Sequence, residues 1–162
     1  MPPKVIVTQV SSLRDISDVE TLFKDYAQAL GIDLSFQDFE AELESLPGKY
    51  APPTGALLLA RFEDTGQAVG CVGLRAFDGN EVCEMKRLYV DPKGRGTGLG
   101  KVLSSAIVSE ARRLRYRAMR LDSLVDMTSA QAIYAHLGFV EIPPYRVNPI
   151  QGARFFELDL MG

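Results

Sequence analysis

Residues 83–101 read CEMKRLYVDPKGRGTGLGK, and they run from an apolar strand through a glycine-rich turn into a helical pattern. Glycine occupies every second position from Gly94 to Gly100. Because glycine has no side chain to block a ligand, consecutive backbone N–H groups can converge there on an anion, at the positive end of the helix that follows. The stretch therefore predicts a strand, a loop and a helix that together bind a diphosphate.

The spacing in this loop excludes two common phosphate-binding motifs and matches a third. A P-loop would need Ser or Thr after Lys101, where the chain has Val102, and no G-x-G-x-x-G can be aligned. The residues that do align are R-x-x-G-x-G at 95–100, after a strand that ends at 88–90. This pattern resembles the acyl-CoA-binding motif of the GNAT superfamily of N-acetyltransferases.

A second stretch carries the same resemblance. Residues 130–139, AQAIYAHLGF, are similar to the family's short helix that carries a tyrosine and closes on Gly-Phe. The clear match covers residues 83–140. The resemblance implies an α/β (α+β) fold of the GNAT type, with a mixed, mainly antiparallel central sheet of about seven strands flanked by about four helices. It also implies that residues 1–162 form a single N-acetyltransferase domain.

The composition is that of an intracellular globular protein. A chain of 162 residues can bury a working core, and 46% hydrophobic with 24% charged residues is ordinary for a soluble domain. No segment is long and apolar enough for a membrane span, and the first residues lack the pattern of a signal peptide. Cys71 and Cys83 lie in predicted strands, which fits a reducing compartment. We therefore expect a cytoplasmic protein without a membrane partner.

Metal ions and nucleic acids are not expected ligands. The chain has a single histidine and no carboxylate or thiol cluster at ligand spacing. A net charge of −3 argues against nucleic acid as the main partner. The arginines at 112–120 fit the C-terminal end of a helix, where basic residues complement the dipole.

Hydrophobic periodicity and turn residues predict the other elements. Strands are expected at residues 5–10, 56–62, 68–77, 81–90, 118–121, 139–142 and 154–160, and helices at 13–30, 36–46, 99–114 and 128–138. Thr128 and Gln131 form a predicted capping box, and Gly138 is a predicted left-handed cap. Residues 49–54 are expected to be a loop.

The resemblance also implies which residues hold the cofactor, acetyl-CoA. The loop would hold the diphosphate, and backbone N–H groups at the strand's end would stabilise the oxyanion if the strand splays from its neighbour at a bulge, as in the family. The candidate cofactor-binding residues are Leu88, Tyr89, Val90, Arg95, Gly96, Thr97, Gly98, Leu99, Gly100, Lys101 and Ser129. Where the family usually has an asparagine that contacts the coenzyme arm, this chain has Thr128 and Ser129. For Arg95 and Lys101 the alternative is an ordinary exposed charge.

Two side chains are candidates for moving protons. An alkyl amine with a pKa of about 10.4 is protonated at neutral pH, so a base must act on it, and a thiolate with a parent pKa of about 8.5 needs an acid when it departs. Glu84 is the candidate base, because some family members carry a catalytic glutamate at this place in the strand. The alternative is a solvent-facing residue balanced by Lys86. Tyr134 resembles the family's general acid, and the alternative is a tyrosine that only packs in the core.

The kind of acceptor stays open. The candidate substrate-binding residues are Tyr50, Arg75, Lys86, Tyr145, Arg146 and Asn148. The three basic residues among them could bind the carboxylate of an amino-acid-like acceptor, and the other three lie in loops that could line a pocket. In contrast, the acidic residues at 33–44 could attract a cationic amine, although such a run is more often a solvated helix face.

Two functions are compatible with these residues. The first is transfer of an acetyl group from acetyl-CoA to a primary amine of a small molecule or peptide by direct attack. The alternative is a non-catalytic acyl-CoA-binding or sensing module of the same fold, which would need neither Glu84 nor Tyr134. Because both residues are present, the enzyme is favoured. Dimers are common in the family, so a second copy of the chain is a candidate partner.

Overall fold

The computed structural model describes residues 4–31, 38–77, 79, 81–124 and 127–161. Its strands are β1 (Val5–Gln9), β2 (Ala56–Phe62), β3 (Ala68–Phe77), β4 (Val82–Val90), β5 (Ala118–Ser123), β6 (Val140–Ile142) and β7 (Arg154–Asp159). Its helices are α1 (Leu13–Leu30), α2 (Phe39–Ser45), α3 (Leu99–Arg113) and α4 (Thr128–Leu137), with short 3-10 helices at Gly48–Tyr50 and Pro92–Gly94. Within these ranges, no helix combines the length and apolar character that crossing a bilayer requires.

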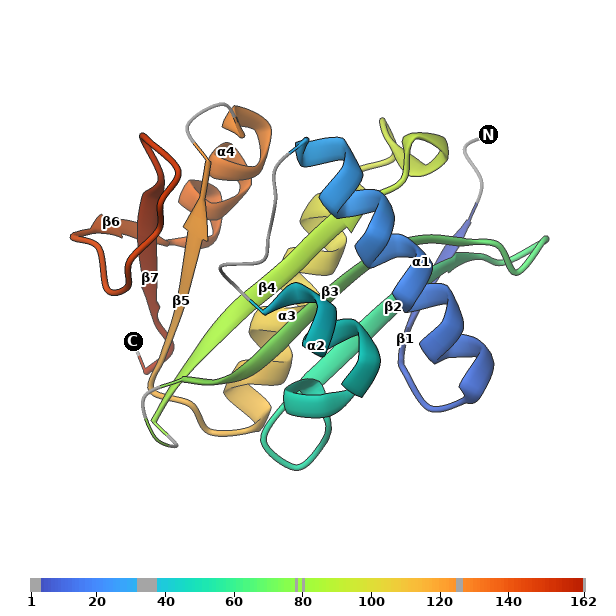
Figure 1. Cartoon of the computed structure of the whole chain (residues 1–162), viewed down its shortest axis with the longest axis horizontal. Helices are drawn as coiled ribbons and strands as arrows, with labels where there is room; N and C mark the ends of the chain where they lie inside the picture. Colours follow the sequence, from blue (N-terminus) through green and yellow to red (C-terminus); the bar gives the residue numbers. More distant parts are fainter. Residues whose placement is uncertain (1–3, 32–37, 78, 80, 125–126, 162) are drawn as a thin grey trace.

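The described strands form one seven-stranded sheet in the order β1-β2-β3-β4-β5-β7-β6. The β4–β5 pair is parallel, and the other neighbouring pairs are antiparallel. Helices α1 and α2 cover one face of the sheet, and α3 and α4 cover the other (Figure 1). The mixed, mainly antiparallel sheet with flanking helices confirms the predicted fold class.

Two apolar clusters hold the helices against the sheet. One cluster joins α3 and α4 to the sheet around Leu103 and Ile107, and the other joins α1 and α2 to it around Val19 and Phe23; all four residues have 0% exposed surface. Burying a side chain of this kind contributes about 1.5–3 kcal/mol. The predicted helical stripe of α1 is confirmed, and the helix begins where the Ser12 side chain accepts from the backbone N–H of Asp15.

A β-bulge in β4 changes which way its side chains point. Gly73 is the register partner of Lys86, and Cys71 is the partner of Tyr89, so the single residue between the glycine and the cysteine faces two residues on β4. One of the two is Arg87, whose φ is 60°. Without the extra residue, alternation would send the Arg87 side chain toward the apolar α3 face. With it, Arg87 packs on the α1 and α2 side.

Strands β4 and β5 diverge beyond their paired ends. Their parallel register covers Val82–Glu84 on β4 and Ala118–Arg120 on β5, although β4 continues to Val90 and β5 to Ser123. Figure 1 shows the two strands meeting at one end and separating toward α4. The splay and the bulge therefore occur together, in the strand where the family resemblance placed them.

Some local expectations differ from the structure. The predicted capping box is wrong. The residue before α4 is Met127 instead of Thr128, and it makes no side-chain cap bond. The Gln131 amide donates to the Leu124 carbonyl at 2.6 Å. The predicted loop at 49–54 begins with a 3-10 helix. The predicted helix at 36–46 is present as α2, and its predicted first residue, Phe36, lies outside the described residues, as do residues 78 and 80 between the predicted strands at 68–77 and 81–90.

Candidate active site

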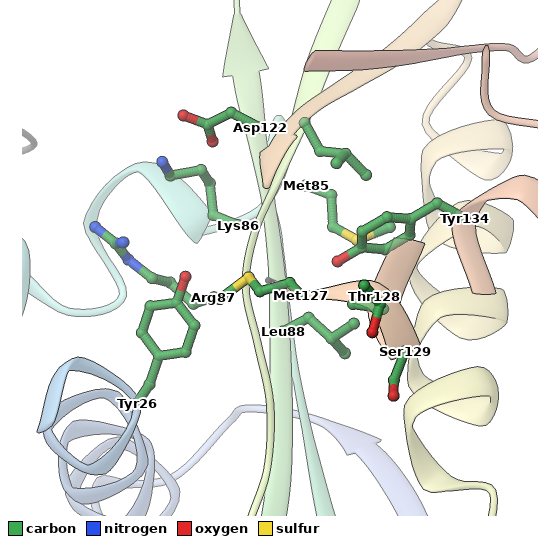
Figure 2. A pocket seen from close by; sticks show the side chains of 12 residues that line it. Tyr26, Met85, Lys86, Arg87, Leu88, Asp122, Met127, Thr128, Ser129 and Tyr134 are labelled. Carbon is green, nitrogen blue, oxygen red and sulfur yellow. The ribbon is translucent and has the colours of Figure 1, made fainter. Parts of the chain in front are cut away.

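A cavity of about 280 Å³ opens in the gap between β4 and β5 (Figure 2). It is lined by Tyr26, Met85, Lys86, Arg87, Leu88, Leu121, Asp122, Met127, Thr128, Ser129, Ala130 and Tyr134. Figure 2 shows Lys86, Arg87 and Tyr26 on one side of β4 and Tyr134, Thr128 and Ser129 on the other. The strand gap therefore joins the two faces of the sheet, so two ligands could meet there from opposite sides.

The glycine loop has the geometry of an anion site. Gly96 and Gly98 have φ of 79° and 77°, and a Cβ added to either would meet no atom within 4 Å. Glycine is thus required there for backbone conformation rather than for space. The first backbone bond of α3 runs from Val102 N to Gly98 O at 3.1 Å. The earlier N–H groups of this helix have no carbonyl in the preceding turn, and they are free to bind an anion.

The side chains of the loop differ in what they can offer to a phosphate. The Thr97 hydroxyl donates to the Gly94 carbonyl, so it stabilises the loop instead of presenting its hydrogen to a ligand. Arg95 is exposed, and its Nε lies 3.3 Å from the Val90 carbonyl. Lys101 is exposed on the first turn of α3. Backbone groups and mobile cations, rather than a fixed hydroxyl, would therefore bind a diphosphate here.

Tyr134 lies on α4 with its hydroxyl directed at the strand gap (Figure 2). Its ring packs against Phe139 and Phe156, with centroid distances of 5.7 and 6.3 Å. Burial raises the pKa of Tyr134 above its ordinary value. The phenol therefore keeps its proton at any physiological pH, which is the state that a general acid needs. Tyr134 therefore packs its ring in the apolar core and also lines the cavity.

Glu84 is fully buried among cations and does not line this cavity. Oε1 accepts from Arg75 at 3.2 Å and from Arg146 at 2.6 Å, and Oε2 accepts from the Tyr145 hydroxyl at 2.7 Å. The alternative of a solvent-facing Glu84 is therefore wrong. Three of the six candidate substrate residues surround this one carboxylate, although Arg75 is far in the sequence from Tyr145 and Arg146.

A second carboxylate, which was not among the candidates from the sequence, lines the cavity. Asp122 lies at the end of β5, on the same side of the gap as Lys86 (Figure 2). Its Oδ2 accepts from the Asn148 amide at 3.2 Å, and Asn148 Oδ1 in turn accepts from the backbone N–H of Ile150 at 2.9 Å. The predicted strand ended two residues too early, so Asp122 fell outside it. The alternation of polar Arg120 and Asp122 with apolar neighbours was the available signal.

Arg87 and Glu42 form an ion pair on the α2 side of the cavity. Arg87 donates to both Glu42 oxygens, at 3.0 and 2.9 Å, and Tyr50 donates to Glu42 Oε2 at 2.8 Å. The side chain of Arg87 is 1% exposed, and its guanidinium lies over the rings of Tyr26 and Phe39. The predicted pocket residue Tyr50 therefore orders this ion pair, and its phenol does not point into the active-site cavity.

Lys86 gives the cavity a titratable amine. It is 4% exposed, and burial lowers its pKa to about 8. The unfolded chain should bind this proton up to about pH 10.4 and the folded chain only up to about pH 8, so stability should rise across that interval. Relative to a Lys86→Met variant, we expect the free energy of unfolding of the natural chain to increase by at most about 3 kcal/mol from pH 8 to 10.4. Urea unfolding at several pH values measures this, and parallel pH profiles of the two proteins would contradict it.

Cys83 is not suited to be a second reactive centre. Cys83 is buried, and burial raises its pKa to about 12, which leaves it inert as a nucleophile. In the part of the chain that the structure describes, no group of three or more His, Cys, Asp or Glu side chains is placed to hold a metal ion.

This chain is similar to known proteins in sequence and in fold. The model of the acetyltransferase (GNAT) family matches residues 17–139. An uncharacterised N-acetyltransferase of Schizosaccharomyces pombe is 38% identical over 159 residues, which is 98% of this chain and 97% of that protein. A GNAT-family acetyltransferase of Staphylococcus aureus has a similar structure, with a TM-score of 0.78, 21% identity and coverage of 97% of this chain and 99% of the other. The Salmonella typhimurium protein yncA, solved with its cofactor acetyl-CoA, superposes with a TM-score of 0.65 and 21% identity over 96% and 94% of the two chains.

Proposed function

This chain belongs to the acetyltransferase (GNAT) family, and from that premise we propose that it transfers an acetyl group from acetyl-CoA to a primary amine of a small molecule or peptide by direct attack. One observation carries the proposal. Tyr134 lines the gap between β4 and β5, and β4 leads directly into the glycine loop. The coenzyme would supply the acetyl group and a thiolate leaving group.

The residues present fit acetyl-CoA. The left-handed glycines leave the loop without side chains at two positions, and the start of α3 offers backbone donors to a diphosphate. Past Glu84, β4 has no pairing with β5, so the backbone N–H groups of Leu88 and its neighbours could meet negative charge on the acetyl oxygen. Ser129 lies on the cavity wall beside Tyr134, where a polar contact to the coenzyme arm could form.

Two side chains would handle the protons. Tyr134 would donate its phenolic proton to the departing sulfur. Asp122 would accept a proton from the acceptor amine, because it shares the cavity with Tyr134. Glu84, the candidate base from the sequence, has both oxygens bound by Arg75, Arg146 and Tyr145. Its contacts support a role as the counter-ion that fixes the two arginines more directly than a role in proton transfer.

The glycine loop offers the test of coenzyme binding. We expect Gly98→Val to raise the dissociation constant of acetyl-CoA at least about tenfold, because a branched side chain is strained at φ 77° and the loop would distort. Gly31→Val is the matched control: its φ is 63°, it also has open space around it, and it lies at the end of α1. Calorimetry with acetyl-CoA measures both variants, and equal affinities would contradict a coenzyme site at this loop.

Turnover separates the enzyme from the alternative, a non-catalytic acyl-CoA-binding module. Purified protein is incubated with acetyl-CoA and a panel of amines that includes polyamines, amino acids and lysine peptides, and free thiol is recorded. Amine-dependent thiol release is the expected result. Tight binding of acetyl-CoA with no release for any amine would favour the binding module instead.

The proposal also covers the domain organisation, the cellular location and the oligomeric state. Residues 1–162 would act as one acetyltransferase domain, because a single sheet takes strands from β1 near the start to β7 near the end. A cytoplasmic location is supported by two buried free thiols, which suit a reducing compartment. A homodimer stays a prediction from the family resemblance.

A further inference from the structure

A row of alternating charges crosses the α1 and α2 face of the sheet. Its members are successive register partners on β3, β4, β5 and β7, namely Arg75, Glu84, Arg120 and Glu157. Arg75 lies 3.2 Å from Glu84, and Arg120 lies 2.8 Å from Glu157. Each charge has an opposite neighbour, so this row is neutral on its own.

Arg146 adds a positive charge that the row does not balance. It comes from the segment between β6 and β7, and its Nη2 lies 2.6 Å from Glu84, so two guanidinium groups share one carboxylate. The Arg146 guanidinium lies 5.4 and 5.3 Å from the ring centroids of Phe77 and Tyr145, which fix its plane. Its Nε is buried and has no hydrogen-bond partner among the residues that the structure describes. The rest of the side chain is accessible, since it is 19% exposed and lines a cavity, so its fixed guanidinium is suited to bind an anionic oxygen.

Arg75 and Arg146 line a second cavity, of about 360 Å³, under α2. Two other charged residues, Lys49 and Asp38, line this cavity. Both are exposed, and their charges are opposite. The remaining acid, Glu42, already accepts two bonds from a guanidinium and one from a phenol. Because Glu84 offsets only one of the two arginines, one excess positive charge remains at the Arg75 and Arg146 side of this cavity.

The second cavity adjoins the active-site cavity across one ion pair. Arg87 lines the active-site cavity, and its partner Glu42 lines the second one. Cavities of a few hundred Å³ are of the size that small ligands occupy. A single acceptor could place its amine near Asp122 and its anionic group against the faces of Arg75 and Arg146 that line the second cavity.

We propose that the acceptor is an amine that also carries a carboxylate, and that Arg75 and Arg146 bind this carboxylate. The proposal rests on the proposed acetyltransferase function and names the substrate class of the same site. A free amino acid and the C-terminus of a short peptide present the same chemistry, and the experiment distinguishes them. A polyamine, which has no carboxylate, would leave the excess positive charge unpaired.

The first test compares acids with their amides on the natural protein. L-methionine is paired with L-methioninamide, and glycylglycine with its amide, with spermidine as the cationic amine; thiol release from acetyl-CoA gives kcat/KM. We expect at least one acid to exceed its own amide by about tenfold or more, since charged hydrogen bonds are lost with the carboxylate. The amide's amine is the more readily deprotonated of the two, so a preference for the acid cannot come from amine basicity. Amides equal to or better than acids, or spermidine above all, would overturn the proposal.

The second test uses two arginines that pack on the same rings. Arg146→Gln should raise KM for the preferred acid by roughly 10- to 100-fold and change KM for acetyl-CoA by less than about twofold. Arg146→Lys should restore part of the loss, since it keeps the charge without the fork. Arg120→Gln is the control, because Arg120 also lies over Phe77 and Tyr145 but pairs with Glu157 and does not line the cavity. Equal effects of Arg146→Gln and Arg120→Gln would count against a carboxylate site.

A binding measurement separates this proposal from the proposed function. Calorimetry of L-methionine, glycylglycine and their amides against protein saturated with coenzyme A needs no turnover. Acid-selective binding that Arg146→Gln abolishes would support the carboxylate site even if no amine were acetylated. Amide turnover without any binding preference for the acids would leave the enzyme standing and reject the carboxylate site.

Discussion

Tyr134→Phe should lower kcat by about 100-fold or more while KM for acetyl-CoA changes by less than about twofold. The substitution removes only the hydroxyl, which points into the gap between β4 and β5, and leaves the ring against Phe139 and Phe156. Without that proton the sulfur must leave as a thiolate, which raises the barrier to bond cleavage. Single-turnover mixing of enzyme, acetyl-CoA and amine isolates this step from product release.

Tyr116→Phe is the matched control for this prediction. Tyr116 is also a buried tyrosine in the cluster between the sheet and α3, but its hydroxyl donates to the Thr54 carbonyl and does not line the active-site cavity. Its variant should keep the natural turnover.

Because burial raises the pKa of Tyr134, the natural enzyme should also keep its acid form, and so its rate, at pH 10. An unchanged single-turnover rate in Tyr134→Phe would remove the phenol from the mechanism.

The sequence was most informative where backbone chemistry is local. The strands at 56–62 and 68–77 have the predicted bounds, because the hairpin turn between them and the apolar runs on each side leave little choice. Gly138 forms the predicted left-handed cap of α4, with φ of 104°. The glycine loop likewise lies where alternating glycines placed it. In each case, neighbouring residues alone determine the conformation.

The bulge in β4 was expected from the family resemblance alone, because the residues of this strand do not specify it. Its strained residue is Arg87 and not a glycine, so no conformational signal marks it. The available hint was two adjacent cations, Lys86 and Arg87, inside an otherwise apolar strand, since strict alternation would bury one of them in the core. The Glu42 carboxylate that receives Arg87 comes from α2, and no pattern in either segment specifies that pairing.

The surroundings of Glu84 were also beyond the sequence. Alternation correctly places Glu84 on one side of β4, yet it predicted Lys86 and solvent as its neighbours. The structure covers that face with Tyr145 and Arg146 from a proline-rich segment 61 and 62 residues away. Long-range covering of this kind depends on how a loop folds back over the sheet, and that is not written in its local composition.

Asp122→Asn should lower kcat/KM for the acceptor by about 100-fold at neutral pH and by much less at alkaline pH. The amide is nearly isosteric and can still accept a hydrogen bond from Asn148, so the cavity should keep its shape. It cannot take a proton from an ammonium group, and that deficit disappears once the pH rises past the pKa of the acceptor's own amine, which is about 8 for a peptide α-amine. A pH–rate profile from pH 6 to 10.5 measures the recovery.

Glu84→Gln provides the contrast that assigns the base. Removing a buried carboxylate from two guanidinium groups should cost about 3 kcal/mol of stability, which urea unfolding records. Among molecules that stay folded, the dependence of the rate on pH should keep the natural shape, because proton removal is assigned to Asp122. If Glu84→Gln instead showed an alkaline recovery of rate and Asp122→Asn did not, the base would be Glu84, and the two arginines beside it would serve to orient a catalytic group rather than to bind the acceptor.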